Sequence, residues 1–90
     1  MCTRVVWPDA NGSVIIGRNM DFHMDLLSNL WKYPRGIERT DGVNGNLTWR
    51  SKYGSLVATA FDLIGTDGMN EKGFAGHILW LTESDYGKPE

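Results

Sequence analysis

The chain has 90 residues, of which 41% are hydrophobic and 22% charged, and its formal net charge is −2 at pH 7. This length allows one small domain, and the weak negative charge without a basic run argues against a nucleic-acid or anionic-membrane surface. A single cysteine excludes a disulfide within the chain, and no stretch approaches the roughly 20 apolar residues of a membrane span.

The only cysteine, Cys2, directly follows the initiator methionine. Methionine aminopeptidases generally act when the second side chain is small, so removal of Met1 would leave one residue with a thiol and a free α-amine. An α-amino group has an ordinary pKa of about 7.7–8.0 and can act as a base near neutral pH. This combination predicts an N-terminal nucleophile. The alternative is that Cys2 is a small hydrophobic residue packed in the first strand.

The first 20 residues predict a β-hairpin. Residues 2–7 are rich in β-branched side chains and predict a strand, and residues 13–20 predict a second one. Between them, residues 8–12 contain Asn11-Gly12, which is suited to a turn with positive φ.

The rest of the chain is also predicted to be mainly β-structure. Residues 22–31 have apolar side chains near helical spacing, but Pro34 and Gly36 follow closely, so a short helix and a loop are equally compatible. The run Asp-Gly-Val-Asn-Gly-Asn at residues 41–46 predicts a turn. It superficially suggests a calcium-binding loop, but the later Glu of such a loop is missing, so the turn is expected to be structural. The remaining expectations are strands at 47–53 and 55–61 that meet near Gly54, a tight connection at 67–73, a strand at 74–81 and a frayed end at 83–90.

Three separated segments are distinctive: Met1-Cys2-Thr3-Arg4, Gly17-Arg18-Asn19-Met20-Asp21-Phe22 and Asp67-Gly68-Met69-Asn70-Glu71-Lys72-Gly73-Phe74. In this order they closely resemble the amino-terminal segment of the choloylglycine hydrolase family, which comprises bile salt hydrolases, penicillin V acylases and related linear-amide C–N hydrolases. The stretches 29–36 and 51–55 are similar to the branch typical of Gram-negative bacteria. The resemblance extends through nearly all 90 residues.

This resemblance implies an α+β fold, the αββα sandwich of N-terminal-nucleophile hydrolases, in which the catalytic Cys opens a central strand. Members of the family exceed three hundred residues, so residues 1–90 are expected to be the N-terminal, mostly antiparallel β segment of one incomplete domain. Such a segment would leave sheet edges and apolar faces exposed. We therefore expect the isolated 90 residues to be poorly stable and nearly inactive.

The resemblance also implies roles for four residues. Cys2 attacks the amide carbonyl, with Arg18 and Asp21 beside it, and Asn70 lies near the oxyanion. These roles are chemically reasonable: an Arg stabilises a thiolate, a carboxylate orients an α-amine, and an Asn donates to a developing oxyanion. Taken singly, however, each would more often be a surface, turn or capping residue.

Local geometry adds one expectation about this site. Arg18 and Asp21 are three residues apart, so a regular strand would point them to opposite faces. Both can reach Cys2 only if the backbone bends near Asn19-Met20 or if Asp21 lies past the strand end. The sequence therefore predicts an irregular strand end at residues 19–22.

The expected acyl-binding residues are Met20, Phe22 and Trp80, because they lie next to the motif residues or on a strand that bears a motif. His23 and His77 are expected to be structural, since the α-amine removes the need for a Cys–His pair. Trp31, Trp49 and Trp80 are expected to lie in the core or on a sheet face.

The predicted reaction is hydrolysis of a linear carbon–nitrogen amide bond, with a bile acid, a phenoxyacetyl group or the fatty acyl group of an acyl-homoserine lactone as acyl part. No metal or organic cofactor is implied, and the expected partner is a small-molecule amide, without nucleic acid or membrane. A homo-oligomer such as a tetramer is an open expectation for the full-length enzyme. The compartment is cytoplasmic if Met1 is the true start and periplasmic if a signal peptide precedes Cys2. The alternative function is a non-catalytic β-rich module or a truncated remnant of such an enzyme.

Overall fold

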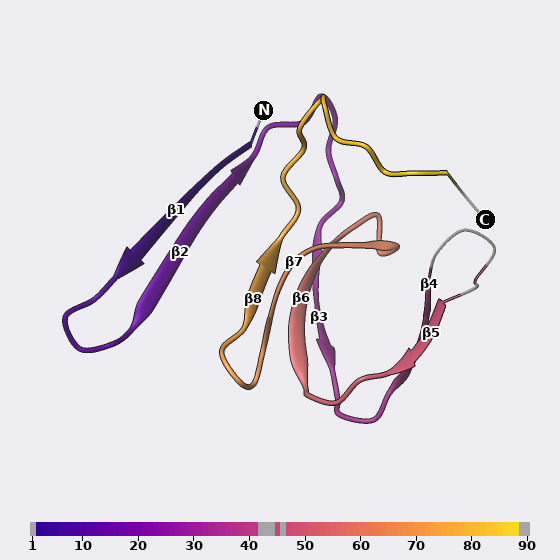
Figure 1. Ribbon diagram of the computed structural model, residues 1–90, viewed down its shortest axis with the longest axis horizontal. Helices are drawn as coiled ribbons and strands as arrows, with labels where there is room; N and C mark the ends of the chain where they lie inside the picture. The colour runs from indigo at the N-terminus through magenta and orange to yellow at the C-terminus, as the bar shows by residue number, and fades with distance from the viewer. Residues whose placement is uncertain (1, 42–44, 46, 89–90) are drawn as a thin grey trace. The chain divides into compact units, whose positions relative to one another are not determined.

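The computed structural model describes residues 2–41, 45 and 47–88, and the regular elements within them are all β-strands (Figure 1). Every pair of neighbouring strands is antiparallel, which confirms the predicted mostly antiparallel β-structure. The strands are β1 (Cys2–Pro8), β2 (Val14–Met20), β3 (Asn29–Tyr33), β4 (Glu38–Asp41), β5 (Leu47–Arg50), β6 (Ser55–Ala60), β7 (Ile64–Asn70) and β8 (Ala75–His77).

The chain forms two compact units, which are described separately. The first contains Met1–Asp25 and Leu79–Ser84, and the second contains Leu26–Ile78 and Asp85–Glu90. The expected loss of Met1, most of the turn expected at 41–46 and the last two residues of the expected frayed end lie outside the described residues.

The first unit is built on the predicted N-terminal hairpin. Strands β1 and β2 pair from Cys2 opposite Met20 to Pro8 opposite Val14. The connecting turn is closed by Asp9, whose N–H donates to the Ser13 carbonyl at 2.7 Å and whose carbonyl accepts from the Gly12 N–H at 3.1 Å. Gly12 has a φ of +85°, a left-handed conformation that favours glycine. The Asn-Gly sequence therefore places the turn as predicted.

The second unit contains a four-stranded sheet with the order β3-β6-β7-β8. Its most buried residues are Thr59 and Ala60, at 3% and 5% exposure, and both lie at the end of the central strand β6. The register between β6 and β7 shifts next to them, between Ala58 and Thr59, as a β-bulge does. The small core of this unit therefore lies beside the bulge.

Strand β7 shows why glycine can occur inside a strand. Gly68 lies opposite Val57 on β6 and opposite Gly76 on β8. A Cβ atom added to Gly68 would lie 3.2 Å from both the Leu56 carbonyl oxygen and the Val57 side chain. The close approach of β6 to β7 therefore favours glycine at this position.

The second unit also contains the hairpin β4–β5, which pairs from Glu38 opposite Arg50 to Asp41 opposite Leu47. Hydrogen bonds join the segment before β4 to the segment after β5. The Gly36 N–H donates to the Ser51 carbonyl at 2.7 Å, and the Ser51 N–H donates to the Ile37 carbonyl at 2.9 Å. The connection β3–β4 and the connection β5–β6 are therefore held side by side.

Several predicted element boundaries were wrong. Of the two alternatives left open for residues 22–31, the loop is present at residues 22–28, but the strand β3, which was not expected, begins at Asn29. Residues 67–70 are not part of a tight connection but the second half of β7. The strands expected at 47–53 and 74–81 are shorter, and the strands expected to meet near Gly54 lie in different sheets.

Many large apolar side chains remain exposed to solvent. No large side chain that the structure describes is fully buried, and Leu63, Phe74, Trp7 and Trp80 are among the most exposed ones. This pattern agrees with a sheet that lacks a covering layer. Within the described residues, no helix has the length and apolar character needed to cross a membrane.

Candidate active site

The hairpin places Cys2 and Arg18 on one face. Cys2 lies directly opposite Met20, and Arg18 is two residues before Met20 on the same strand. Residues that lie opposite each other in an antiparallel pair share a face, and diagonal neighbours are within reach of a long side chain. All three are half-buried, whereas Asn19 between Arg18 and Met20 is exposed. The guanidinium of Arg18 also donates to the Asn19 carbonyl at 3.3 Å.

Asp21 is the first residue after β2, which ends at Met20. The chain from Asp21 to Phe22 has no regular structure, so the strand ends within the predicted interval 19–22. A regular strand does not continue through Asp21, and the alternation of faces therefore does not restrict the direction of its side chain. Of the two predicted geometries, the structure has the one in which Asp21 lies past the strand end.

The three expected acyl-binding residues all belong to the first unit. Met20 pairs with Cys2 on β1, and the exposed Phe22 ring lies 4.4 Å from the His23 ring, tilted by 41°. Trp80 belongs to Leu79–Ser84 of this unit and is exposed. The expectation that Trp80 lies on a strand was wrong, because β8 ends at His77.

Asn70 belongs to the second unit and ends β7. Its side-chain Oδ1 accepts hydrogen bonds from the Lys72 N–H at 2.9 Å and from the Phe74 N–H at 3.0 Å. Its backbone N–H donates to the Phe74 carbonyl at 2.9 Å, and its carbonyl accepts from the Gly73 N–H at 3.0 Å. Asn70 therefore organises the turn from β7 to β8, and the two bonds to Oδ1 fix which end of its amide faces the turn.

The next residue, Glu71, was not singled out from the sequence. Its carboxylate accepts a hydrogen bond from Arg35 Nε, a second from Arg35 Nη2 at 2.6 Å and a third from the Gly54 N–H at 2.8 Å. The hydrogen bond from Arg35, followed by the one from Gly54, lowers the pKa of Glu71 to about 2. No sequence signal connects Arg35 with Glu71, because the two are separated by 36 positions.

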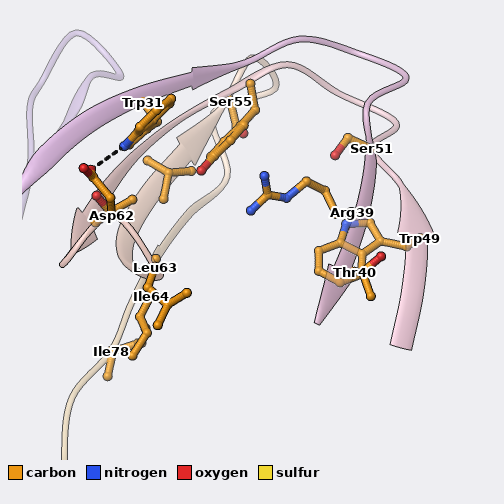
Figure 2. A pocket seen from close by; sticks show the side chains of 14 residues that line it. Trp31, Arg39, Thr40, Trp49, Ser51, Ser55, Asp62, Leu63, Ile64 and Ile78 are labelled. Carbon is orange, nitrogen blue, oxygen red and sulfur yellow. Dashed lines mark hydrogen bonds between the residues drawn. The ribbon is translucent and has the colours of Figure 1, made fainter. Parts of the chain in front are cut away.

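A polar contact holds the turn between β6 and β7 against β3. The Asp62 carboxylate accepts from Asn29 Nδ2 at 2.7 Å. It also accepts from Trp31 Nε1 at 2.9 Å, the contact drawn in Figure 2. These hydrogen bonds, that of Trp31 first, lower the pKa of Asp62. Asp62 and Phe61 have φ values of +53° and +55°, so the contact holds two residues in a conformation that side chains disfavour.

A cavity of about 620 Å³ also belongs to the second unit (Figure 2). Its lining includes Trp31, Arg39, Trp49, Ser55, Asp62 and Ile78. Trp31 and Trp49 line this open cavity from β3 and β5, which agrees with the expected sheet-face position. Of the described residues predicted for the site, none lines it.

His77 is paired with Asp67. Its Nδ1 lies 2.9 Å from Asp67 Oδ1 across the β7–β8 pair, and its side chain is 10% exposed. Its Nε2 is buried without a hydrogen-bond partner among the described residues. Among all the residues that the structure describes, no group of three or more His, Cys, Asp or Glu side chains could hold a metal ion.

Comparisons with known proteins agree in pointing to one family. The sequence model of the linear amide C–N hydrolases, choloylglycine hydrolase family, matches residues 2–90. The chain is 44% identical over 95 residues to a protein named penicillin V acylase from Pectobacterium atrosepticum. This alignment covers 97% of this chain and 25% of that protein. The chain therefore spans about a quarter of the length of this curated relative.

Similarity in structure supports the same relationship. The structure of penicillin V acylase from Agrobacterium tumefaciens matches with a TM-score of 0.86 and 44% identity, covering 98% of this chain and 28% of that one. This likeness confirms the predicted fold relationship for an N-terminal part. Because the family model matches all residues from 2 to 90, the chain belongs to the choloylglycine hydrolase family of linear amide C–N hydrolases.

Proposed function

We propose that this chain forms the nucleophile-bearing N-terminal part of an enzyme that hydrolyses linear amide C–N bonds. The observation that carries the proposal is the shared face of Cys2 and Arg18 on the hairpin β1–β2. A cation within reach of a thiol stabilises the thiolate, which is the reactive form. Family membership supports the reaction class.

The mechanism begins after Met1 has been removed. The α-amine of Cys2 takes the thiol proton, and the thiolate attacks the amide carbonyl carbon to form a tetrahedral oxyanion. When the C–N bond breaks, the leaving amine takes the proton from the α-ammonium and a thioester remains on Cys2. Water then attacks the thioester while the α-amine takes its proton, and the acid and the free thiol are released after that proton returns to sulfur.

The other predicted residues have separate roles in this proposal. Arg18 holds the thiolate, and the Asp21 carboxylate accepts hydrogen bonds from the α-amine and orients it. Asn70 donates from Nδ2 to the oxyanion, which is consistent with Oδ1 accepting the two backbone N–H groups of the turn. Met20, Phe22 and Trp80 contact the acyl group.

The first substrate to test is penicillin V, because the two relatives described above are named as penicillin V acylases. Its phenoxyacetyl group is flat and aromatic, so exposed rings such as Phe22 and Trp80 can stack on it. Glycine- and taurine-conjugated bile acids and acyl-homoserine lactones are the alternative substrates. They share the linear amide bond but differ in the acyl group.

The test compares wild type, Cys2→Ala and Cys2→Ser in the full-length polypeptide, with intact mass measured on the same samples. We expect the active wild type to lack Met1 and Cys2→Ala to lose at least about 10³-fold in kcat, as does loss of other covalent nucleophiles. Methionine retained on the active protein, or activity retained by Cys2→Ala, would contradict the mechanism. If wild type cleaves none of these amides, the non-catalytic β-rich module becomes the better description.

A further inference from the structure

Three connections of the second unit meet at Glu71. Glu71 begins the turn from β7 to β8, Arg35 lies between β3 and β4, and Gly54 lies between β5 and β6. The Glu71 carboxylate accepts from Arg35 and from the Gly54 N–H, and the Glu71 N–H donates to the Gly54 carbonyl at 2.9 Å. Gly54 is therefore bonded to Glu71 through both of its backbone polar groups.

This arrangement fixes the residue that precedes Glu71. The backbone and Oδ1 of Asn70 make four hydrogen bonds, all within the turn 70–74. These bonds set the orientation of the Asn70 amide relative to the turn, but they do not attach the turn to the neighbouring strands. Strand pairing attaches Asn70 to Ser55 on β6, and Glu71 adds an attachment beyond the strand end, because its side chain and backbone reach the connections β3–β4 and β5–β6.

We propose that Arg35 and Glu71 are positioning residues that hold the turn 70–74 so that Asn70 Nδ2 keeps a fixed direction. The inference rests on the proposed function, because it assigns a purpose to the position of Asn70. Neither side chain needs to touch the substrate. A donor fixed before the reaction stabilises the oxyanion without reorganisation at the moment of attack, and small displacements of such groups lower the rate strongly.

The Glu71 carboxylate is held by more hydrogen bonds than an ordinary surface ion pair provides. An exposed pair contributes little to stability, and the Arg35 side chain is indeed 68% exposed. Here, however, Arg35 binds both carboxylate oxygens and the backbone N–H of Gly54 adds a third donor. A two-pronged contact of this kind fixes direction as well as distance.

The experiment uses the full-length polypeptide with the variants Glu71→Gln, Arg35→Met, Asn70→Ala and the double variant Glu71→Gln/Asn70→Ala. We expect Glu71→Gln and Arg35→Met each to lower kcat by about 10-fold while KM changes less than about twofold. In the Asn70→Ala background, Glu71→Gln should lower kcat no further, because both changes act through one group. Arg35→Lys keeps the positive charge but loses the bidentate guanidinium contact, so its kcat should lie between those of Arg35→Met and wild type.

Glu38→Gln is the matched control, because Glu38 forms an exposed ion pair with Arg50 at 3.2 Å in the same unit. It removes the same charge without contact to the turn 70–74, and kcat should stay within about twofold of wild type. Hydrogen exchange gives a readout independent of turnover. The Lys72 and Phe74 amides, which donate to Asn70 Oδ1, should exchange faster in Glu71→Gln than in Glu38→Gln.

The outcomes separate the two proposals. Unchanged exchange at Lys72 and Phe74 in Glu71→Gln, or an equal loss of kcat in the presence and absence of Asn70, would overturn the positioning role while leaving the Cys2 mechanism intact. An unchanged kcat in Asn70→Ala would remove the oxyanion role and the positioning role with it. Activity of Cys2→Ala would instead refute the proposed function at its nucleophile.

Discussion

The two units of the chain organise polar chemistry in different ways. In the first, the hairpin register itself brings Cys2, Arg18 and Met20 onto one face. In the second, side chains far apart in sequence make the decisive contacts: Glu71 with Arg35, and Asp62 with Asn29 and Trp31. A site on the hairpin can therefore be derived from strand alternation, whereas a site in the second unit depends on contacts between loops.

This difference has consequences for substitution. A hairpin residue such as Arg18 is placed by the backbone ladder, so replacing it should change chemistry more than structure. A residue such as Glu71 or Asp62 holds several segments together, so replacing it should change structure first. The following experiments test that distinction, beginning with the largest expected effect.

Arg18→Met should lower kcat by about 10- to 100-fold, because the Cys2 thiolate loses its cation while β1 and β2 stay paired. Arg18→Lys should lose less, since the charge remains. The rate of Cys2 alkylation by iodoacetamide at pH 7 should fall in the same order, and the melting temperature should change little. Equal losses from Arg4→Met, which lies opposite Arg18 on β1, would show that the general positive field matters rather than Arg18.

Gly68→Ala should destabilise the second unit by about 1–3 kcal/mol, the cost of overpacking. The added Cβ would lie 3.2 Å from the Leu56 carbonyl oxygen, which cannot move as a flexible side chain would. Gly76 is the matched control because it pairs with Gly68 and an added Cβ there meets no atom within 4 Å. Urea unfolding should show Gly76→Ala near wild type, and similar midpoints for both variants would contradict the close approach of β6 to β7.

The smallest expected effect concerns the pH range in which the ionised Glu71 carboxylate keeps its contact with Arg35. Its pKa is lowered from 4.5 to about 2, so the carboxylate contact is fully present above pH 4.5 and is lost as the pH falls towards 2. Carboxyl ¹³C NMR should give a titration midpoint of about 2 in wild type and one closer to 4.5 in Arg35→Met. An unchanged midpoint in Arg35→Met would mean that Arg35 does not hold the carboxylate.

The parts of the fold that were predictable have local signals. The hairpin β1–β2 follows from β-branched strands and an Asn-Gly turn, and its end at Met20 follows from the motif geometry. Strands β3 and β7 were not predicted correctly. The apolar spacing of β3 also suits a helix, and β7 contains Gly65, Asp67 and Gly68, which are uncommon in strands.

The site was predictable to a similar extent. The positions of Cys2, Arg18 and Asp21 could be reasoned from register, and their roles stay predictions. The contacts of Glu71 with Arg35 and Gly54 could not, because they join three connections that lie far apart in the sequence. Trp80 was placed on the wrong kind of segment, since its apolar neighbours suggest a longer strand than β8.

At Phe61 and Asp62, an unfavourable backbone conformation occurs together with hydrogen bonds that attach the turn to β3. Hairpin turns with two left-handed residues favour Asn-Gly, and that pair would relieve the backbone here. The same exchange would remove the carboxylate that Asn29 and Trp31 bind. Optimising the backbone of this turn alone would thus weaken the attachment of β3. The left-handed backbone at Phe61 and Asp62 accompanies the position of the carboxylate that connects the turn to β3.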